Sequence, residues 1–597
     1  MKPTIRASLL FLLVLILHLA LCLFPPQLAA ATKSPCVIPS TLKFRYALLG
    51  NPCSYLDWTE KRLRSLKASG FNAIQLNIAW LRRPNDEALN LNDVVTLPGD
   101  IESTRTAQRR AQLQTRLALA RKVGLRTLFH FGSPFMWRNP KTGEIHRQDP
   151  EAFKQDWYDS ANPKVIEYET GLLREFRKAF PKVDDILVYT YDQDAWEASE
   201  WGNSKFSRGL PLDRRLPPYL EALHQAWTDG RTSGTDHIMW WEPWELSAGE
   251  VYHIVPQLPT QNFGLMLHGD IAEAQITMPG DVWLKNTARM AQARNIPVIV
   301  EGFFGSATEE IEPLSFPFPR LTDEELQAFA RVKGVVGVKE YFGILTDTPD
   351  LNLEMFTARL NEKNPCVSTE QLLQKITARF GQNQKAVISI VNDLADAIQT
   401  YPWDASWYAR LAGTGNIDHG WNAAFIRGQQ VETPSWESTR RAHFMVTEDQ
   451  QNHPFLLEDV QLRMETAIGY LDSALKNGSK LIPKLRDSPD KQMLNHALAD
   501  AAKFRRVAVS YSLHLRETNV AMLLRADMDN KATTNSALLK EMDSLLVRDS
   551  ANEQGTSNTA AIKLKEFRKD AAAWLKTNLL PTTKAPRERG VFTLTTR

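Results

Sequence analysis

Carboxylates follow several short apolar runs of this sequence, at the point where each run ends. Asp192 and Asp194 follow one run, Glu301 ends another, and Glu242 and Glu340 end two more. Two carboxyl groups that lie close together can divide the roles of acid and base, because their mutual repulsion raises the pKa of one of them. Hydrolysis of a glycosidic bond requires such a pair. The pattern therefore predicts a hydrolytic site built from carboxylates.

The position of each acid suggests a role. Asp192 and Asp194 are separated by one residue, so on an extended segment both side chains face the same way. We expect Asp194 to be the general acid, with Asp192 raising its pKa or orienting the substrate. Glu301 is the expected nucleophile or base. We expect Glu242 and Glu340 to contact the substrate or to serve as alternative catalytic groups.

Other interpretations of the acids stay open. Glu197 lies further along the same loop and could replace Asp194. A ring of carboxylates could also bind a divalent metal, because carboxylates are hard oxygen ligands. Hydrolysis is favoured because aromatic neighbours suit a sugar and no metal-ligand spacing is recognisable, so we expect no metal and no cofactor. Each acid could instead form a salt bridge. This applies most to Glu340, which follows Lys339, and least to Glu301, which ends a buried apolar run.

Histidines and aromatic residues near the ends of the runs are candidates for substrate binding. His130 and His268 end two of the runs and could bind a sugar hydroxyl, or could simply be hydrogen-bonded to their surroundings. Trp241 and Tyr341 adjoin the acids of two other runs and could stack on a sugar ring. Large aromatic side chains also fill large cores, so the same residues could be structural.

The apolar runs themselves predict the fold. They are apolar on both faces and alternate with helical stretches, which is typical of parallel strands buried on both sides. Eight such units in about 300 residues fit a (β/α)₈ TIM barrel, with its active site at the carboxyl ends of the strands. An open doubly wound sheet would show the same pattern, but no glycine-rich phosphate loop follows the first run. The expected strands are residues 43–50, 73–79, 125–131, 185–191, 237–241, 263–267, 297–300 and 335–339.

A helix-stop residue precedes several of these runs. Gly70, Gly124 and Gly334 each stand just before an apolar run, and Asn295 takes the place of the glycine before the seventh run. Glycine and asparagine tolerate the left-handed backbone conformation that ends many helices. A stop residue that recurs before successive strands is typical of the helix-to-strand loops of a barrel.

The pattern changes near residue 364. Long helical patterns follow, over 369–380, 386–400, 457–476, 489–524, 537–547 and 560–579. We therefore expect a barrel domain over 32–364, an all-α domain over 365–580 and a disordered tail over 581–597. The aromatic segment 401–436 could lean over the barrel mouth or pack the helices onto the barrel.

The N-terminal segment is typical of a signal peptide. Lys2 and Arg6 precede an apolar run over 7–24, and small residues at 29–31 form a cleavage pattern. We expect residues 1–31 to be removed and the protein to be secreted or periplasmic. An uncleaved membrane anchor is the alternative.

Export would permit disulfides. Cys36 and Cys53 flank the first run and could pair, which would leave Cys366 over. The 597 residues are too many for one core, and 43% hydrophobic with 23% charged is an ordinary globular composition. A formal net charge of +2 without a concentrated basic cluster argues against nucleic-acid binding.

A family resemblance follows from these motifs. Glu301 after Pro297-Val298-Ile299-Val300 resembles the strand-seven nucleophile of clan A retaining glycosidases. The acids after the fourth run fall where that clan keeps its general acid, although the clan's Asn-Glu is replaced here by 192–194, Asp-Gln-Asp. A barrel followed by helices also resembles the α-glucuronidase and β-hexosaminidase-like families. The resemblance implies an exported glycoside hydrolase-like protein acting on an oligo- or polysaccharide. The alternative is a non-catalytic carbohydrate-binding or scaffold protein.

Overall fold

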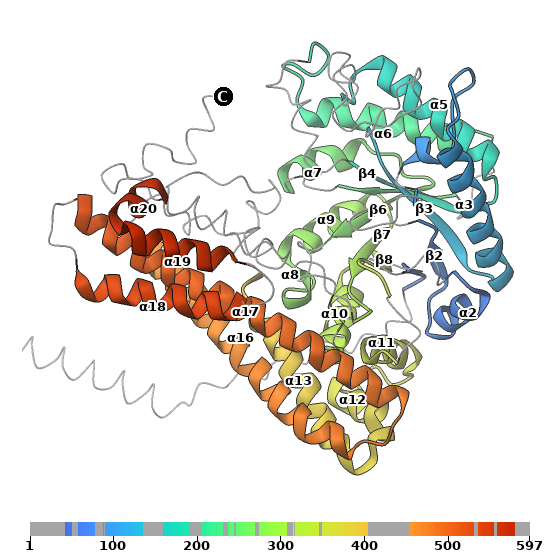
Figure 1. Cartoon of the computed structure of the whole chain (residues 1–597). Helices are drawn as coiled ribbons and strands as arrows, with labels where there is room; N and C mark the ends of the chain where they lie inside the picture. The colour runs from blue at the N-terminus through green and yellow to red at the C-terminus, as the bar shows by residue number, and fades with distance from the viewer. Residues whose placement is uncertain are drawn as a thin grey trace, which may run out of the picture.

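The structure is a computed structural model of the whole chain. The described residues are 42–49, 58–77, 87–88, 90–134, 159–190, 204–230, 237–243, 246, 248–268, 274–306, 314–315, 317–344, 349–403, 453–529, 535–553 and 558–578. They form a strand–helix barrel followed by a region of long helices (Figure 1).

Eight parallel strands close into a barrel, each strand paired with its neighbours in the sequence and β8 paired with β1. The expected TIM barrel is therefore confirmed, and the alternative of an open sheet is wrong. Each strand lies within about two residues of its expected start. The strands are β1 Phe44–Ala47, β2 Ala73–Gln75, β3 Arg126–Gly132, β4 Asp185–Tyr189, β5 Met239–Glu242, β6 Phe263–His268, β7 Val298–Gly302 and β8 Val335–Glu340.

Helices surround the barrel and cover the outer faces of its strands (Figure 1). Their apolar side chains and the outward side chains of the strands form one large core. Several of these helices begin at a side-chain N-cap, as at Thr59, Ser103 and Asp281. The helices are α2 Glu60–Ala68, η3 Leu91–Asp93, α3 Thr104–Val123, α5 Pro163–Ala179, α6 Leu212–Thr228, α7 Ala248–Ile254, η5 Val255–Gln257, α8 Ala274–Thr277, α9 Val282–Ala293, α10 Pro319–Arg331 and α11 Leu351–Asn361.

The expected helix-stop residues adopt the left-handed conformation. Gly70, Gly124 and Gly334 have φ of 103°, 74° and 92°, and Asn295 has φ of 58°. Asparagine is one of the few side-chain-bearing residues that tolerate this region. The four positions turn α2, α3, α9 and α10 into the strands that follow them.

Inward side chains at the amino end of the barrel form a small apolar core of their own. They include Tyr46, Leu128, Leu187, Met266 and Ile299, which come from five different strands. Trp240 of β5 fills the middle of this layer and is fully buried. Gly264 on the neighbouring strand makes room for it, since a Cβ there would lie 2.2 Å from Trp240 Cζ3.

Asp185 joins four strands just below that layer. Its carboxylate accepts the Tyr46 hydroxyl of β1 at 2.5 Å, Arg126 Nη2 of β3 at 2.6 Å and the Ile238 N–H before β5 at 2.8 Å. Burial raises the pKa of Asp185, and the Arg126 guanidinium opposes that rise. The network fixes the amino end of the barrel, which leaves the carboxyl end for a functional site.

The expected helical region is confirmed, and most of its helices are longer than expected. The helix expected over 369–380 instead ends at Thr377 and is followed by the 3₁₀ helix η6. The segment 560–579 was expected to be one helix but forms two, because Asp570 leaves the helical conformation and its carboxylate caps the second helix through the Ala573 N–H at 2.9 Å. The helices are α12 Thr369–Thr377, η6 Ala378–Asn383, α13 Gln384–Thr400, α16 His453–Leu481, η11 Ile482–Lys484, α17 Pro489–Asp529, α18 Ser536–Glu553, α19 Thr559–Lys569 and α20 Ala571–Asn578.

The helical region and the barrel share a hydrophobic core. Phe303 and Tyr341 from the ends of β7 and β8 belong to the same buried cluster as Leu394 of α13 and Met464 of α16. Tyr401 and Trp403 also lie in this cluster, where both rings contact Phe504. These two residues of the aromatic segment therefore pack the helices, and residues 404–436 lie outside the described part.

One cysteine expectation is wrong. The pairing of Cys36 with Cys53 falls outside the described residues, but Cys366, which that pairing would leave over, is disulfide-bonded. The expectation rested on sequence proximity alone, and the other three cysteines lie outside the described residues.

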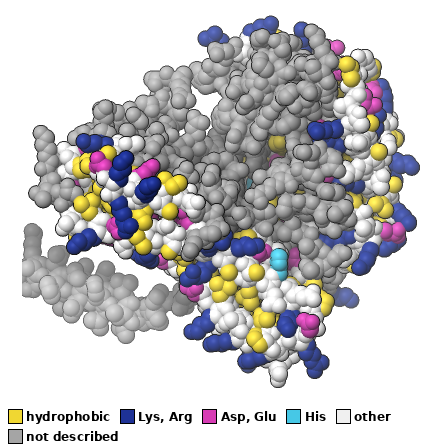
Figure 2. Space-filling view, viewed as in Figure 1, with side chains coloured by type: hydrophobic (Ala, Val, Ile, Leu, Met, Phe, Trp, Pro, Cys, Tyr) yellow, Lys and Arg dark blue, Asp and Glu magenta, His cyan; other side chains and the backbone are white. Residues whose placement is uncertain are grey.

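The surface carries both signs of charge. On the face seen in Figure 2, Lys and Arg side chains lie among Asp, Glu and hydrophobic side chains over the described helices. This agrees with the small net charge. Among the described helices, none combines the length and the apolar character needed to cross a membrane.

Gly264→Ala tests the packing of the barrel interior. The added methyl group would collide with the Trp240 ring, so we expect a loss of about 1–3 kcal/mol in the free energy of unfolding. Gly469→Ala in α16 is the control, because no heavy atom lies within 4 Å of a Cβ there. We expect that change to stabilise by about 0.5–1 kcal/mol. Urea unfolding measures both, and an unchanged midpoint for Gly264→Ala would contradict the packing described.

Candidate active site

A polar layer lines the barrel above the apolar one. Successive residues of a strand face opposite sides, so the residue two positions after each inward apolar residue also faces inward. Leu187, Trp240 and Ile299 are inward, and therefore so are Tyr189, Glu242 and Glu301. We call this layer the polar ring; it comprises Gln75 of β2, His130 of β3, Tyr189 of β4, Glu242 of β5, His268 of β6, Glu301 of β7 and Lys339 of β8.

Glu301 and Lys339 form a buried ion pair in the ring. Lys339 Nζ lies 2.5 Å from Glu301 Oε1, and neither side chain is exposed. His268 Nδ1 lies 3.7 Å from the other carboxylate oxygen, Oε2. Burial raises the pKa of Glu301, while Lys339 and Glu242 oppose that rise. The ammonium group therefore favours a negative charge on Glu301 although both side chains are buried.

Glu242 forms a coupled carboxyl pair with Glu301. Burial raises the pKa of Glu242 well above its usual value, and the charge on Glu301 raises it further. The contact between the two carboxyls raises the pKa of Glu242 and lowers that of Glu301, so protonation of the pair is favoured at Glu242. Among the described residues, neither oxygen of Glu242 has another hydrogen-bond partner.

His130 lies beside Glu242, the first member of the carboxyl pair. Its Nε2 lies 3.6 Å from Glu242 Oε2, and its ring meets the Tyr189 ring edge to face at 5.1 Å. Burial lowers the pKa of His130 well below its usual range, and the charge of Lys339 lowers it further. A neutral imidazole can donate or accept a proton, so His130 can hold Glu242 without adding charge.

His268 lies beside Glu301, the second member of the carboxyl pair, and Tyr341 packs against His268. Their rings lie 4.2 Å apart at 32°, and the Tyr341 N–H donates to Gly302 O at 2.8 Å, which fixes the ring beside the end of β7. His268 is 7% exposed, the highest value among His130, Glu242, His268, Glu301 and Lys339. The structure thus brings His130 and His268 together with Glu242 and Glu301, and Tyr341 contacts His268. The expected binding of a sugar hydroxyl by the histidines stays a prediction.

Glu340 is placed differently from the expectation. It follows the inward Lys339, so strand alternation turns its carboxylate out of the barrel. There it accepts backbone N–H groups from two loops, at 2.9 Å from Phe304, 3.1 Å from Gly305, 3.3 Å from Phe342 and 3.0 Å from Gly343. Burial raises the pKa of Glu340 to about 7. Its oxygens are occupied by the backbone, so we assign it a structural role in place of substrate contact.

Trp241 also faces away from the ring. It precedes the inward Glu242, so its fully buried ring lies in the core between the strands and the helices. Its indole N–H lies 3.4 Å from Thr190 Oγ1. The expected stacking of Trp241 on a sugar is therefore incompatible with this position.

Asp192, Asp194 and Glu197 lie outside the described residues. They follow β4, whose last inward residue is Tyr189 of the ring. Their expected roles as general acid and its neighbour therefore stay predictions.

The sequence interpretation missed three ring residues, Gln75, Tyr189 and Lys339, of which Lys339 carries a charge. It was considered only as a salt-bridge partner of its neighbour Glu340. The sequence did contain a signal for Lys339, because it is a charged residue in the otherwise apolar run of β8. A lysine is buried only when its charge is paired. The ammonium also argues against a divalent metal among the ring carboxylates, because it already supplies the positive charge there.

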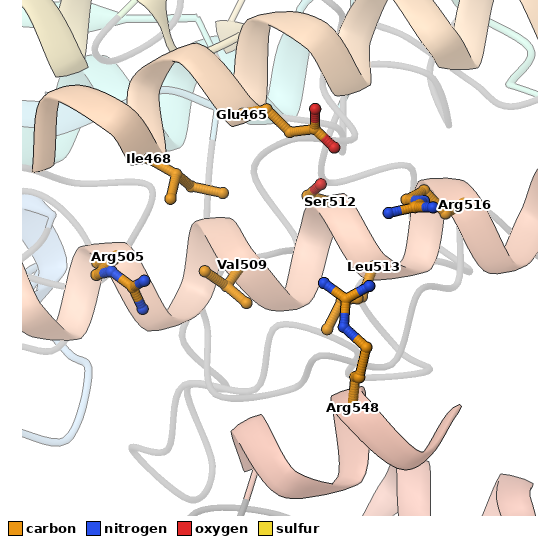
Figure 3. A pocket seen from close by; sticks show the side chains of 8 residues that line it. All are labelled: Glu465, Ile468, Arg505, Val509, Ser512, Leu513, Arg516 and Arg548. Carbon is orange, nitrogen blue, oxygen red and sulfur yellow. The ribbon is translucent and has the colours of Figure 1, made fainter. Parts of the chain in front are cut away.

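A surface groove lies elsewhere, between α16, α17 and α18 (Figure 3). Its volume is about 310 Å³. It is lined by Glu465, Ile468, Arg505, Val509, Ser512, Leu513, Arg516 and Arg548, none of which belongs to the polar ring. We therefore place the candidate active site in the barrel and not in this groove.

Neither a family model nor a curated protein matches the sequence. Among solved structures, a family 138 glycoside hydrolase targeting pectin rhamnogalacturonan II aligns over 90% of this chain and 84% of its own, with a TM-score of 0.52 and 11% identity. A family 89 glycoside hydrolase from Clostridium perfringens in complex with PUGNAc aligns over 91% and 61%, with a TM-score of 0.38 and 9% identity. A family 5 glycoside hydrolase from Prevotella bryantii aligns over 54% and 99%, with a TM-score of 0.35 and 11% identity.

The likeness to the family 138 enzyme concerns the fold. It extends over the barrel and the helical region together. The resemblance to glycoside hydrolases is therefore confirmed at the level of architecture, and this chain has a glycoside hydrolase-like fold. Because a barrel hosts many activities, the function has to be argued from the polar ring.

Lys339→Met tests the electrostatics of the ring. Burial raises the pKa of Glu301 above its ordinary value of 4.5, which is the value in the unfolded chain. Between these two pKa values the folded protein therefore binds more protons than the unfolded chain. The free energy of unfolding therefore falls as pH rises through the raised pKa. Removing the ammonium raises the pKa of Glu301 further, so the free energy of unfolding decreases more as pH rises. We expect a loss of about 3–5 kcal/mol near pH 8 and a smaller loss near pH 5.

Urea unfolding at the two pH values measures this difference. Lys178→Met is the control, because Lys178 is 71% exposed and pairs with Glu175 at the surface. A loss of stability for Lys339→Met that is equal at both pH values would contradict the ion pair as the compensating interaction.

Proposed function

We propose that this protein is an exported glycoside hydrolase that cleaves glycosidic bonds in an oligo- or polysaccharide. The observation that carries the proposal is the buried pair Glu242–Glu301 with Lys339, at the carboxyl ends of the strands of a closed barrel. Burial and the charge of Glu301 raise the pKa of Glu242, whereas the Lys339 ammonium at 2.5 Å favours Glu301 as the anion. Barrel enzymes place their catalytic groups at this end.

Glu301 is the proposed nucleophile or base. Lys339 stabilises its carboxylate, and His268 approaches its other oxygen. As a nucleophile it would attack the anomeric carbon while the leaving oxygen takes a proton from a general acid. As a base it would instead take a proton from the attacking water. The separation of the two working carboxyls decides between these routes, at about 5–5.5 Å for retention and about 6.5–9.5 Å for inversion.

Asp194 is the proposed general acid, with Asp192 beside it. Glu242 is a second candidate because burial and the charge of Glu301 raise its pKa. However, Glu242 contacts Glu301 directly, and two carboxyls in contact leave no room for a glycosidic oxygen between them. In our proposal Glu242 therefore positions Glu301 and holds the proton that keeps the two buried acids together.

A non-catalytic carbohydrate-binding barrel is the alternative function. The burial of the ring favours it, because Glu242 and Glu301 are 1% and 0% exposed and their charge is already compensated by Lys339. The polar ring could therefore stabilise the barrel without taking part in catalysis. Turnover of a glycan separates the two functions.

Glu301→Gln tests the catalytic proposal. The mature chain is first screened against aryl glycosides and against plant, bacterial and host glycans. Rhamnogalacturonan II is included because a structure of the same architecture targets it. On any substrate found, we expect Glu301→Gln to lower kcat by at least about 10³-fold, because the amide can neither attack carbon nor take a proton.

Glu325→Gln is the matched control for that variant. Glu325 is a fully buried carboxyl outside the ring, and burial raises its pKa well above the usual value. We expect the activity of the Glu325→Gln variant to stay close to that of the wild type. Near wild-type activity of Glu301→Gln would contradict the assignment, whereas glycan binding without any turnover would establish the alternative function.

Leaving-group dependence identifies the general acid. A substrate whose leaving phenol is acidic needs little protonation, so loss of the acid matters little for it. We expect Asp194→Asn to lower kcat/KM strongly for natural glycans and weakly for dinitrophenyl glycosides. Glu242→Gln is compared in the same assay. If Glu242→Gln shows that selective loss and Asp194→Asn does not, the acid is Glu242.

Export belongs to the same proposal. Lys2, Arg6 and the apolar run over 7–24 support it. We expect mass spectrometry of the native protein to find a chain that begins near Thr32. A native chain that retains residues 1–31 would establish the membrane-anchored alternative.

A further inference from the structure

A second cluster of chemically active side chains lies in the helical region. His514 and Glu517 lie on α17 and Asp549 lies on α18, and the possible ligand atoms of the three all lie within 4.8 Å of one another. His514, Glu517 and Asp549 are 2%, 6% and 0% exposed. Residues three apart on a helix share a face, so α17 presents His514 and Glu517 together.

Hydrogen bonds within the protein satisfy this cluster only in part. Asp549 Oδ1 accepts the Ser510 hydroxyl at 2.9 Å, and Asp549 Oδ2 is hydrogen-bonded to His514 Nε2. That same nitrogen lies 3.9 Å from Glu517 Oε2. In the described part of the chain, Glu517 Oε1 has no hydrogen-bond partner. One imidazole N–H cannot serve two carboxylates well, so Glu517 is left poorly satisfied in a dry environment.

The charges around the cluster are mostly negative. Glu553 lies one turn after Asp549 on α18, and its charge acts on Glu517 together with that of Asp549. Glu553 Oε2 accepts the N–H of Ala560, at the start of α19, at 2.8 Å. Lys563 acts on Glu517 with the opposite sign. Buried carboxylates are costly unless a cation compensates them, and a bound divalent ion would provide that charge.

We propose that His514, Glu517 and Asp549 bind a divalent transition-metal ion, Zn²⁺ by preference, which ties α17 to α18. One imidazole nitrogen and two carboxylate oxygens are a ligand set that zinc accepts, at about 2.0–2.2 Å from the ion. Ca²⁺ takes six to eight oxygens and suits the imidazole poorly. The ion would also supply the partner that Glu517 Oε1 lacks. The site is independent of the proposed glycosidase activity.

The experiment uses the full mature chain, stripped of metal with a chelator and titrated with Zn²⁺ in a calorimeter. We expect one ion per chain. Glu517→Gln and His514→Gln should each weaken binding by at least about 100-fold, because each removes a ligand. Asp543→Asn is the control, since Asp543 lies on the same helix α18 but pairs with Arg568 at the surface. It should leave Zn²⁺ binding unchanged, and Ca²⁺ should not replace Zn²⁺.

Thermal unfolding gives a second readout. We expect Zn²⁺ to raise the wild-type midpoint by at least about 2 °C and to leave the midpoint of Glu517→Gln unchanged. If a variant does not fold, metal analysis of the purified wild-type chain decides alone. A wild type that binds no Zn²⁺ overturns the proposal. So does binding that survives both ligand changes, because the ion would then lie elsewhere.

Discussion

The Lys339 ammonium group compensates the charge at the centre of the barrel. Lys339 Nζ contacts Glu301, and its charge also acts on Glu242 and His130. Without it, two buried carboxyls would face each other with His130, whose pKa is lowered by burial, and His268 beside them. With it, Glu301 is favoured as the anion and Glu242 as the protonated acid. The chemistry that we propose depends on this division, because Glu301 must be ionised to act as nucleophile or base while Asp194 supplies the proton.

The barrel provides the position of that group. Alternation along each strand places Trp240 in the lower layer and Glu242 in the polar ring, with Trp241 between them in the outer core. Gly264 allows the large indole to fill the lower layer. Asp185 joins four strands at the amino end and so fixes the strands whose other ends carry the ring. Stability and the candidate site therefore occupy opposite ends of the same strands.

The sequence predicted the fold well because its signals were local. Apolar runs buried on both faces, and stop residues such as Gly124 and Asn295, depend only on nearby residues. The site was predicted less well, because one step along a strand reverses the direction of a side chain. Glu301 was assigned inward, whereas Glu340 and Trp241 face outward. Long-range pairs were invisible: Lys339 meets Glu301 across β7 and β8, and His514 meets Asp549 across two helices.

Infrared spectroscopy of the carboxyl groups tests the central claim most directly. A protonated carboxyl and a carboxylate absorb at different frequencies, and difference spectra against single Glu→Gln variants assign each band. At neutral pH the account predicts a protonated-carboxyl band that disappears in Glu242→Gln, and a carboxylate band that disappears in Glu301→Gln. Loss of a carboxylate band in both variants would mean that the two acids are equally ionised, and it would contradict the division of charge on which the account depends.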